Sequence, residues 1–233
     1  MTTAPEIAVS TVIFALRPDG AARPVLSLPL VVRTRDPYDG MWALPGGPLG
    51  EESLEDAARR TLAATTGLEP AYLEQMYTFG DPDRSPDGRR VVSIVYWALV
   101  RADEVGRATP QQNVRWLPAD DLPRLAFDHN LVVDYALWRL RTKLSYSRVA
   151  HALLDETFTL SELRQVHEIV RRQRLDPANF RRQIEADGAV VPTGEVRTGG
   201  AHRPARLYRY DTAVDPVDLG PFARPSTPPR SLS

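Results

Sequence analysis

Residues 42–52 read Trp-Ala-Leu-Pro-Gly-Gly-Pro-Leu-Gly-Glu-Glu, and this stretch decides how the N-terminal half of the chain is interpreted. Its glycines and prolines favour tight turns and close backbone approaches. Beyond it, apolar residues recur at the spacing of one helical face, at Leu54, Ala57, Ala58 and Leu62. Ser53 is placed to cap the start of this helix and Gly67 to end it. The stretch therefore predicts a glycine-rich loop that leads into a helix.

The composition indicates a globular protein with room for two domains. The chain has 233 residues, of which 42% are apolar and 25% are charged. It contains no cysteine, which excludes disulfides, thiol catalysis and cysteine-based zinc sites and favours a cytoplasmic location. No stretch approaches 20 apolar residues, so we expect no association with a membrane. The net charge is -1, but residues 197–209 contain four arginines and no acid, a local basic strip suited to a phosphate backbone.

Five segments around the quoted stretch have the composition of strands, and a helix follows them. The segments are rich in β-branched and aromatic residues and are bounded by turn residues, at 7–16, 25–33, 73–79, 91–100 and 114–117. A long polar loop is expected at 80–88. A helical pattern runs over 131–144, with Asp128 as its candidate N-cap. We predict a first domain over residues 1–144 that ends with this connector helix.

The remaining sequence predicts a winged helix-turn-helix over residues 145–212. A short helix is expected at 147–154. Thr159 and Glu162 form the pattern of a capping box, and Asp176-Pro177 marks a second helix start that runs to Gly188. After the turn at 192–194 come two strand-like segments, at 195–198 and 205–210. Helix, helix and β-hairpin is the order of elements in a winged helix. Residues 213–233 are rich in proline and serine, and we expect a disordered tail there.

The glycine-rich loop and its helix resemble the signature of the Nudix family. Gly46, Glu52, Arg60 and Gly67 stand at the positions that the family motif requires. The resemblance implies an α+β protein, with a Nudix α/β/α sandwich around a mixed sheet, followed by the winged helix-turn-helix domain.

One part of the Nudix signature is missing. In Nudix enzymes, as the family is known, glutamates on one face of the signature helix hold Mg²⁺ or Mn²⁺ against a diphosphate. This chain has Thr61, Ala64 and Thr65 at those positions, and hydroxyl and methyl groups do not supply the carboxylate oxygens that a hard divalent ion prefers. We therefore predict no metal site, no catalytic residue and no enzymatic activity. The alternative is an active hydrolase of ADP-ribose or another nucleoside diphosphate derivative, with an altered metal site at Glu51, Glu52 and Glu55.

Residues 79–84, 88–89 and 126–129 resemble the branch of the Nudix superfamily linked to ADP-ribose and to NAD metabolism. The resemblance implies ADP-ribose, or a related nucleotide, as an effector, with no cofactor required. The candidate ligand-binding residues are Gly46, Gly47, Glu52, Arg60, Asp81, Arg84, Arg89 and His129. The charged residues and the histidine also have a simpler interpretation: Arg60 braces the loop through Glu52, the charged loop residues are solvated, and His129 belongs to a helix start.

Residues 158–163, 175–182, 192–194 and 203–208 resemble the C-terminal half of Nudix-related transcriptional regulators of NAD biosynthesis and salvage. In a helix-turn-helix, the N-terminal part of the second helix lies nearest the bases. The candidate DNA-binding residues are Arg172, Arg174, Asn179, Arg181, Arg182, Arg197 and Arg203. Of these, residues 179–182 suit base contacts and the others phosphate or minor-groove contacts. Arg206 and Arg209 have the pattern of the solvated face of a strand.

Taken together, the resemblances imply a homodimeric repressor of NAD biosynthesis or salvage genes. Its partners would be double-stranded DNA with a palindromic operator and a small nucleotide effector. The hydrolase with an appended domain is the competing hypothesis. A nucleotide-dependent protein-interaction module is a third.

Overall fold

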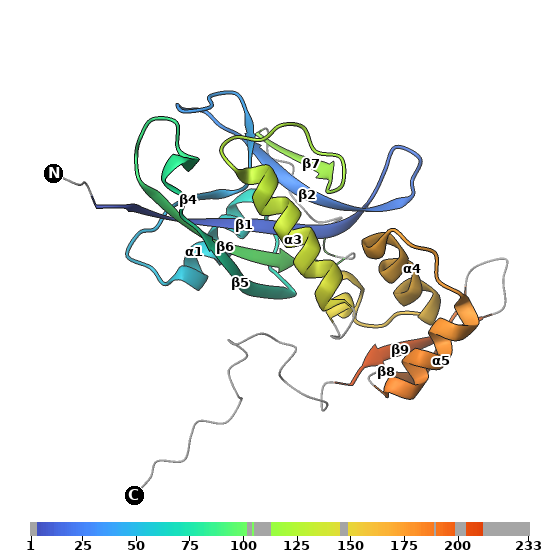
Figure 1. The fold of residues 1–233 in the computed structure, drawn as a ribbon. Coiled ribbons are helices and arrows are strands. Elements are labelled where there is room, and N and C mark those ends of the chain that lie inside the picture. Colours follow the sequence, from blue (N-terminus) through green and yellow to red (C-terminus); the bar gives the residue numbers. More distant parts are fainter. Residues whose placement is uncertain are drawn as a thin grey trace, which may run out of the picture.

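The computed structural model describes residues 4–101, 104, 113–144, 149–188, 190–198 and 204–211. The N-terminal part is a sheet covered by helices, and the C-terminal part is a group of short helices beside a two-stranded hairpin (Figure 1). None of the described helices has the length and apolar character needed to cross a membrane. The predicted tail at 213–233 lies outside the described residues, as do residues 145–148, where the second domain is predicted to begin.

The main sheet is mixed and is built around its first strand. β1 (Glu6–Pro18) pairs in parallel with β6 (Val91–Leu99) and antiparallel with its other neighbours. The sheet order is β3-β2-β1-β6-β5, with β4 pairing to β1 and β7 to β2. The remaining strands are β2 (Pro24–Val32), β3 (Trp42–Ala43), β4 (Gly46–Pro48), β5 (Tyr72–Phe79) and β7 (Val114–Pro118). The five predicted strand segments are confirmed, with ends that differ by one or two residues.

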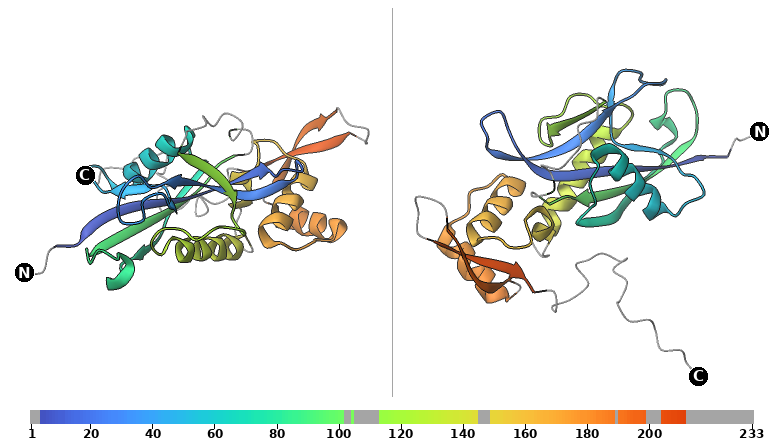
Figure 2. Two further views of the ribbon diagram at one scale, coloured as in Figure 1. Left: turned by 90° about the horizontal axis from the view of Figure 1, so that it is seen from above. Right: turned by 180° about the vertical axis from the view of Figure 1, so that it is seen from behind.

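Two helices cover the two faces of this sheet, which confirms the predicted sandwich (Figure 2). β1 has its apolar side chains on both faces, because it lies at the centre of the sheet. Ile13 packs with Leu62 of α1 (Leu54–Thr66). Val12 and Phe14 belong to the larger core that also contains the apolar face of α3 (His129–Lys143). As predicted, the Ser53 side chain accepts from the Asp56 N–H, and Gly67 ends α1 with a left-handed backbone.

The glycine-rich stretch is not the open loop that its composition predicts. It contains β3 and β4, and β4 pairs Gly47 with Val9 and Gly46 with Ser10 of β1. A side chain at Gly46 would start 2.7 Å from the Val9 carbonyl oxygen and 2.8 Å from Ser10 Oγ. Position 46 therefore requires glycine, because only a hydrogen atom fits where β1 and β4 approach each other. Short-range sequence patterns do not reveal this requirement.

The C-terminal part has the helix and hairpin order of a winged helix. Its elements are the 3-10 helix η2 (Val149–Leu153), α4 (Leu160–Arg171), α5 (Pro177–Asp187), β8 (Val190–Arg197) and β9 (Ala205–Tyr210). The capping box of Thr159 and Glu162 is present, and the Asp176 side chain caps α5. The predicted turn at 192–194 is wrong, because β8 runs through it with a shift of register between Pro192 and Val196. The described part of the predicted helix at 147–154 is a 3-10 helix that ends at Leu153.

The two parts share one hydrophobic core and are joined at the end of α3. Arg141 Nε donates to the Val170 carbonyl of α4 at 2.9 Å, and Arg171 Nη2 donates to the Leu144 carbonyl at 3.1 Å. In the same turn of α3, Lys143 Nζ lies 2.7 Å from the buried Glu74 carboxylate of β5. The last turn of α3 is thus fixed both to the sheet and to the winged helix.

Two histidines are buried in a neutral form. His167 of α4 faces the Phe180 ring of α5 at 5.2 Å, and burial, with a smaller effect of Arg171, lowers its pKa to about 4. Burial likewise lowers the pKa of His129, at the start of α3, to about 4. Both positions favour the uncharged ring in the folded state.

These histidines predict a loss of stability in mild acid. Each of these histidines binds a proton near pH 6.5 in the unfolded chain but only near pH 4 in the folded chain. The stability that the neutral ring contributes is therefore present above pH 6.5 and is lost as the pH falls from there toward pH 4. Between pH 7 and pH 5, we expect the free energy of unfolding to fall by about 2 kcal/mol for each histidine. Urea titration at both pH values measures this fall. In the His167→Leu variant, the fall in the free energy of unfolding should be smaller than in the unaltered protein by about 2 kcal/mol. If the free energy of unfolding falls equally in the variant and in the unaltered protein, His167 is not the buried neutral group described above.

Candidate ligand pocket and nucleic-acid interface

A cavity of about 250 Å³ opens beside β4 in the N-terminal part. Its walls come from β1, the loop after β2, the loop before β6 and the start of α3. Five predicted ligand residues line it: Gly46, Gly47, Arg84, Arg89 and His129. The fold therefore brings together residues that are as far apart as positions 46 and 129, because β4 and the start of α3 meet at the same side of the sheet.

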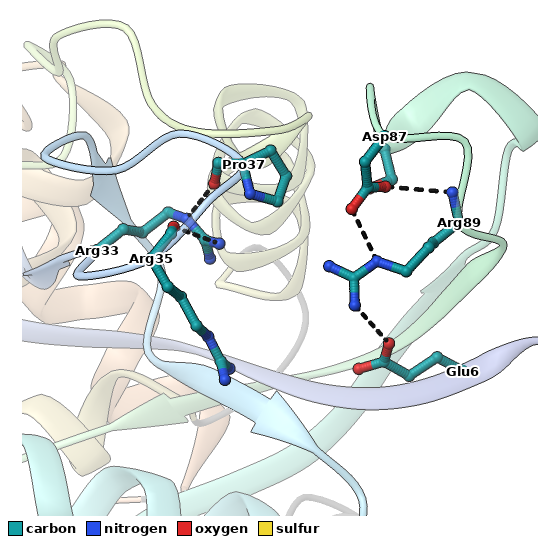
Figure 3. Close-up of polar contacts among 7 residues, drawn as sticks. Glu6, Arg33, Arg35, Pro37, Asp87 and Arg89 are labelled. Carbon is teal, nitrogen blue, oxygen red and sulfur yellow. Dashed lines mark hydrogen bonds and ion pairs between the residues drawn. The ribbon is translucent and has the colours of Figure 1, made fainter.

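Four arginines line this cavity, and two of them, Arg33 and Arg35, were not predicted from the sequence. Figure 3 shows Arg33, Arg35 and Arg89. Arg33 Nε donates to the Pro37 carbonyl at 2.8 Å, and its guanidinium lies 4.6 Å from the Phe127 ring centre. Arg35 follows two residues later, and its side chain is exposed. Arg89 lies across from them. Burial lowers the pKa of Arg33, and the charges of Arg35 and Arg89 lower it further.

This convergence of positive charge suits an anionic ligand. Arg89 is held by exposed acids, at 2.7 Å from Asp87 and 3.7 Å from Glu6. Exposed pairs of this kind are weak, so a ligand phosphate can replace them with charge-assisted hydrogen bonds. Arg33 and Arg35 could have been found from the sequence, because they lie at the end of a predicted strand and just after it. Loops that follow strands are a common position for binding residues.

His129 and Arg84 have fixed structural contacts at the wall of the cavity. His129 Nδ1 accepts the Leu44 N–H at 3.0 Å, so the neutral ring carries its proton on Nε2. The Arg84 guanidinium is almost fully buried and makes two bonds to Asp128, at 2.7 and 3.1 Å, and one to Ser93 Oγ at 2.5 Å. Asp128 is the N-cap residue of α3, as predicted, but its carboxylate binds Arg84 and makes no cap bond.

Glu52, Arg60 and Asp81 do not line this cavity. Arg60 binds Glu52 through two bonds, at 2.6 and 3.1 Å, on the exposed side of the loop. The hydrogen bond from Arg60 holds the pKa of Glu52 below its usual value. This geometry agrees with the simpler reading, in which Arg60 braces the glycine-rich loop. Asp81 is exposed and precedes the 3-10 helix η1 (Pro82–Arg84).

The face of α1 that carries carboxylates in Nudix enzymes is uncharged here. Thr61 and Thr65 are buried, and the Thr65 hydroxyl donates to the Thr61 carbonyl at 2.7 Å. Among the described residues, no group of three His, Cys, Asp or Glu is placed to hold a metal ion. In the alternative site, Glu52 and Glu55 are each bound by an arginine, Arg60 and Arg59 respectively.

The helix α5 presents the predicted base-reading residues on the surface of the winged helix. Phe180 is the buried residue of α5, and Asn179, Arg181 and Arg182 are exposed. Arg181 Nε lies 2.8 Å from Glu185 Oε1, and this bond raises the pKa of Arg181. Arg182 Nη2 donates to Asn179 Oδ1 at 2.7 Å. Amide and guanidinium groups at this end of a recognition helix are suited to base edges.

The other predicted DNA contacts lie around α5. Arg172 and Arg174 are exposed in the turn before it, with Arg172 3.8 Å from Asp120. Arg197 binds Glu162 and the Thr157 carbonyl, so it joins the hairpin to the start of α4. Arg203 lies outside the described residues. A groove between the start of α4, α5 and the hairpin also contains Arg206, which the sequence pattern assigned only to a solvated face.

Comparisons with known proteins agree with this geometry. Residues 7–135 match the NUDIX domain family, and residues 150–210 match the NrtR DNA-binding winged helix domain family. A relative from Acinetobacter baylyi, named ADPR responsive transcriptional repressor NtrR, is 32% identical over 79% of this chain and 76% of its own length. The crystal structure of Shewanella oneidensis NrtR complexed with a 27mer DNA is 34% identical, covers 88% of this chain and 93% of that chain, and has a TM-score of 0.76. An ADP-ribose pyrophosphatase from Methanocaldococcus jannaschii is 32% identical over 54% of this chain and 75% of its own length.

Proposed function

This chain belongs to the NrtR family, in which a NUDIX domain is joined to a DNA-binding winged helix, and we propose that it is a transcriptional repressor whose DNA binding responds to ADP-ribose. The main support for the proposal is that the cavity and the winged helix are connected through α3 and share one hydrophobic core. An arginine-lined cavity lies at one end of α3, and the winged helix is bonded to its other end.

The winged helix supports recognition of double-stranded DNA. α5 places an asparagine and two arginines on the surface without burying any of them. The relative from Shewanella oneidensis, which matches over both parts of this chain, is the one complexed with DNA. A winged helix reads one half-site, so a palindromic operator requires two copies of the chain. We therefore propose a homodimer that binds upstream of NAD biosynthesis or salvage genes in the cytoplasm.

The cavity supports a nucleotide diphosphate as effector. Arg33, Arg35 and Arg89 offer several guanidinium donors to phosphate oxygens. The relative from Acinetobacter baylyi is named for its response to ADPR. ADP-ribose combines a diphosphate with two riboses and an adenine, and it would bind here without a metal or other cofactor.

In this proposal, the N-terminal domain binds ADP-ribose without hydrolysing it. The helix that would hold a catalytic metal has Thr61 and Thr65 buried, and their hydroxyl groups do not replace carboxylates. The competing function, an ADP-ribose hydrolase, is favoured by the NUDIX match and by the similarity to a pyrophosphatase.

Incubation with ADP-ribose and Mg²⁺ or Mn²⁺ separates these two functions. We expect ADP-ribose to remain intact, because one exposed glutamate and water give only weak Mg²⁺ binding. The measurement is release of AMP followed by chromatography, with Glu52→Gln as the matched variant. AMP release that this substitution abolishes would establish the hydrolase and remove the sensor proposal.

A second prediction concerns the recognition helix. Arg181→Ala should weaken binding to operator DNA by about 1 to 3 kcal/mol if Arg181 contacts a base. The operator is first located by gel shift with the upstream regions of the chain's own gene and of NAD genes, at moderate salt. Fluorescence anisotropy then gives the affinities. Arg59→Ala is the matched control, because Arg59 makes a comparable surface pair with Glu55 at 2.8 Å on the other domain.

Loss of affinity in both variants, or in neither, would remove Arg181 from the proposed interface. No retarded band with any of the upstream regions would argue against the DNA-binding function as a whole.

A third prediction concerns the effector. Arg35→Ala should lower the affinity for ADP-ribose at least about 10-fold, because a charge-assisted hydrogen bond contributes roughly 1.5 to 3 kcal/mol. Arg60→Ala should leave the affinity nearly unchanged, since Arg60 binds Glu52 outside the cavity. Isothermal titration calorimetry without added metal measures both. The reverse ranking of the two variants would place the ligand on the signature helix instead.

A further inference from the structure

The hairpin of the winged helix places two arginines on different faces. Val196 of β8 and Arg206 of β9 stand directly opposite each other in the strand pairing, and such residues share one face of the hairpin. Arg197 is the next residue along β8, so its side chain points to the other face. The hairpin lies beside α5 (Figure 1). Between them, a groove of about 680 Å³ is lined by Val196 and Arg206, whereas Arg197 is not among the described residues that line it.

Arg197 is held by contacts within the winged helix itself. Its guanidinium binds the Glu162 carboxylate of α4 through Nη1 and the Thr157 carbonyl through Nη2, the latter at 3.4 Å. The second oxygen of the same carboxylate accepts the Thr159 N–H at 2.7 Å and the Thr159 hydroxyl at 3.0 Å. Glu162 thus closes the first turn of α4 and also holds β8. Arg197 attaches the hairpin to the helix through this carboxylate.

A second attachment joins the start of α4 to the other strand of the hairpin. The Phe158 N–H donates to the Tyr208 carbonyl at 2.9 Å, and the Tyr208 N–H donates to the Phe158 carbonyl at 2.8 Å. The segment before α4 therefore pairs with β9 in the manner of a short third strand. With Arg197 holding β8, both strands have a fixed position relative to α4.

Arg206 has different surroundings from Arg197. Its side chain is exposed, and no described acid forms an ion pair with it, whereas Arg181 and Arg197 are each paired with a glutamate. Arg181 of α5 lies on the opposite wall of the groove, and the described residues that line the groove include these two arginines and no acid. A positively charged groove beside a recognition helix suits the phosphates of DNA.

We propose that Arg206 is the residue of the hairpin that contacts the DNA backbone, and that Arg197 is a positioning residue that holds the hairpin against α4. The sequence pattern favours the opposite assignment, with Arg197 on the phosphate and Arg206 merely solvated. Their places in the strand pairing and the partner of Arg197 support the exchange of roles. This assignment rests on the proposed DNA-binding function and names one phosphate contact within it.

The salt dependence of DNA binding tests the contact of Arg206. Each neutralised phosphate releases counterions, which contributes about 0.9 to the slope of log affinity against log salt concentration. The affinity that Arg206→Ala loses should therefore be about 3.5-fold larger at about 50 mM than at about 200 mM salt. The loss should be equal on the operator and on an unrelated DNA fragment, because a phosphate contact carries no sequence information. Fluorescence anisotropy over a salt series measures both.

Arg209→Ala is the matched control for this measurement. It removes the same charge from the same strand, but Arg209 does not line the groove, so the salt slope should stay that of the unaltered protein. The melting temperature of Arg206→Ala should also stay unchanged, because no described acid pairs with Arg206. The Arg206 result does not depend on the stability of the hairpin, since both attachments to α4 remain in that variant.

Glu162→Gln tests the role of Arg197 through the sign of its effect. Glutamine can still close the capping box, but it no longer binds Arg197 as an ion pair. If Arg197 is a positioning residue, Glu162→Gln and Arg197→Ala should lower DNA affinity by a similar factor at each salt concentration. The double variant should lose no more than either single one. If Arg197 instead contacts a phosphate, removal of its acidic partner would raise the affinity, and the proposed role would be overturned.

The outcomes separate this assignment from the proposed function. Normal DNA binding with an unchanged salt slope in Arg206→Ala would overturn the assignment and leave the repressor in place. An equal fall of the slope in Arg209→Ala would do the same. Absence of DNA binding by the unaltered protein would contradict both the repressor and the contact.

Discussion

A buried carboxylate on β5 fixes the position of α3, on which both sites depend. Glu74 accepts hydrogen bonds from Tyr72, from Trp97 Nε1 at 3.2 Å, and from Lys143 Nζ at 2.7 Å. Burial alone raises the pKa of this carboxyl, but the bonds from Lys143 and Tyr72 outweigh that effect and hold the pKa below its usual value. Burying an ion pair is a poor way to gain stability, yet it has a strict geometry. The last turn of α3 can therefore occupy one register on the sheet, and the winged helix bonded to that turn is placed with it.

The sequence predicts those features whose partners lie close together in the chain. The caps at Ser53, Thr159 and Asp176 bond to amides three residues away, so a local pattern is sufficient to identify them. The contacts that build the ligand cavity are of another kind. Arg84 and Asp128 are 44 residues apart, and Leu44 and His129 are 85 apart. No periodicity or capping rule links such positions. The local pattern therefore identifies Asp128 as the start of a helix, but it cannot show that the Asp128 side chain binds Arg84.

The signature helix shows why a motif can persist after its chemistry is gone. In a Nudix enzyme this helix both packs on the sheet and holds a metal. Here Ala57, Ala58 and Leu62 remain buried against the sheet. Gly46 remains because β1 and β4 approach too closely for a side chain. Glu52 and Arg60 bind each other on the surface. Each retained motif residue thus has a structural role, and the match to the motif does not by itself require a metal.

The two proposed binding surfaces hold their arginines in the same way before any ligand arrives. In the cavity, Arg89 is bound by Asp87 and Glu6, and on α5, Arg181 is bound by Glu185. Such exposed pairs contribute little to stability, but they hold each guanidinium near the place where a phosphate or base would bind. A ligand that replaces these pairs can alter DNA binding only if it prefers one arrangement of the chain over another. The rigid element between the two surfaces is α3. The first turn of α3 lines the cavity, where His129 accepts the Leu44 N–H, and its last turn is bonded to Val170 of α4, so α3 is the direct connection between the two surfaces.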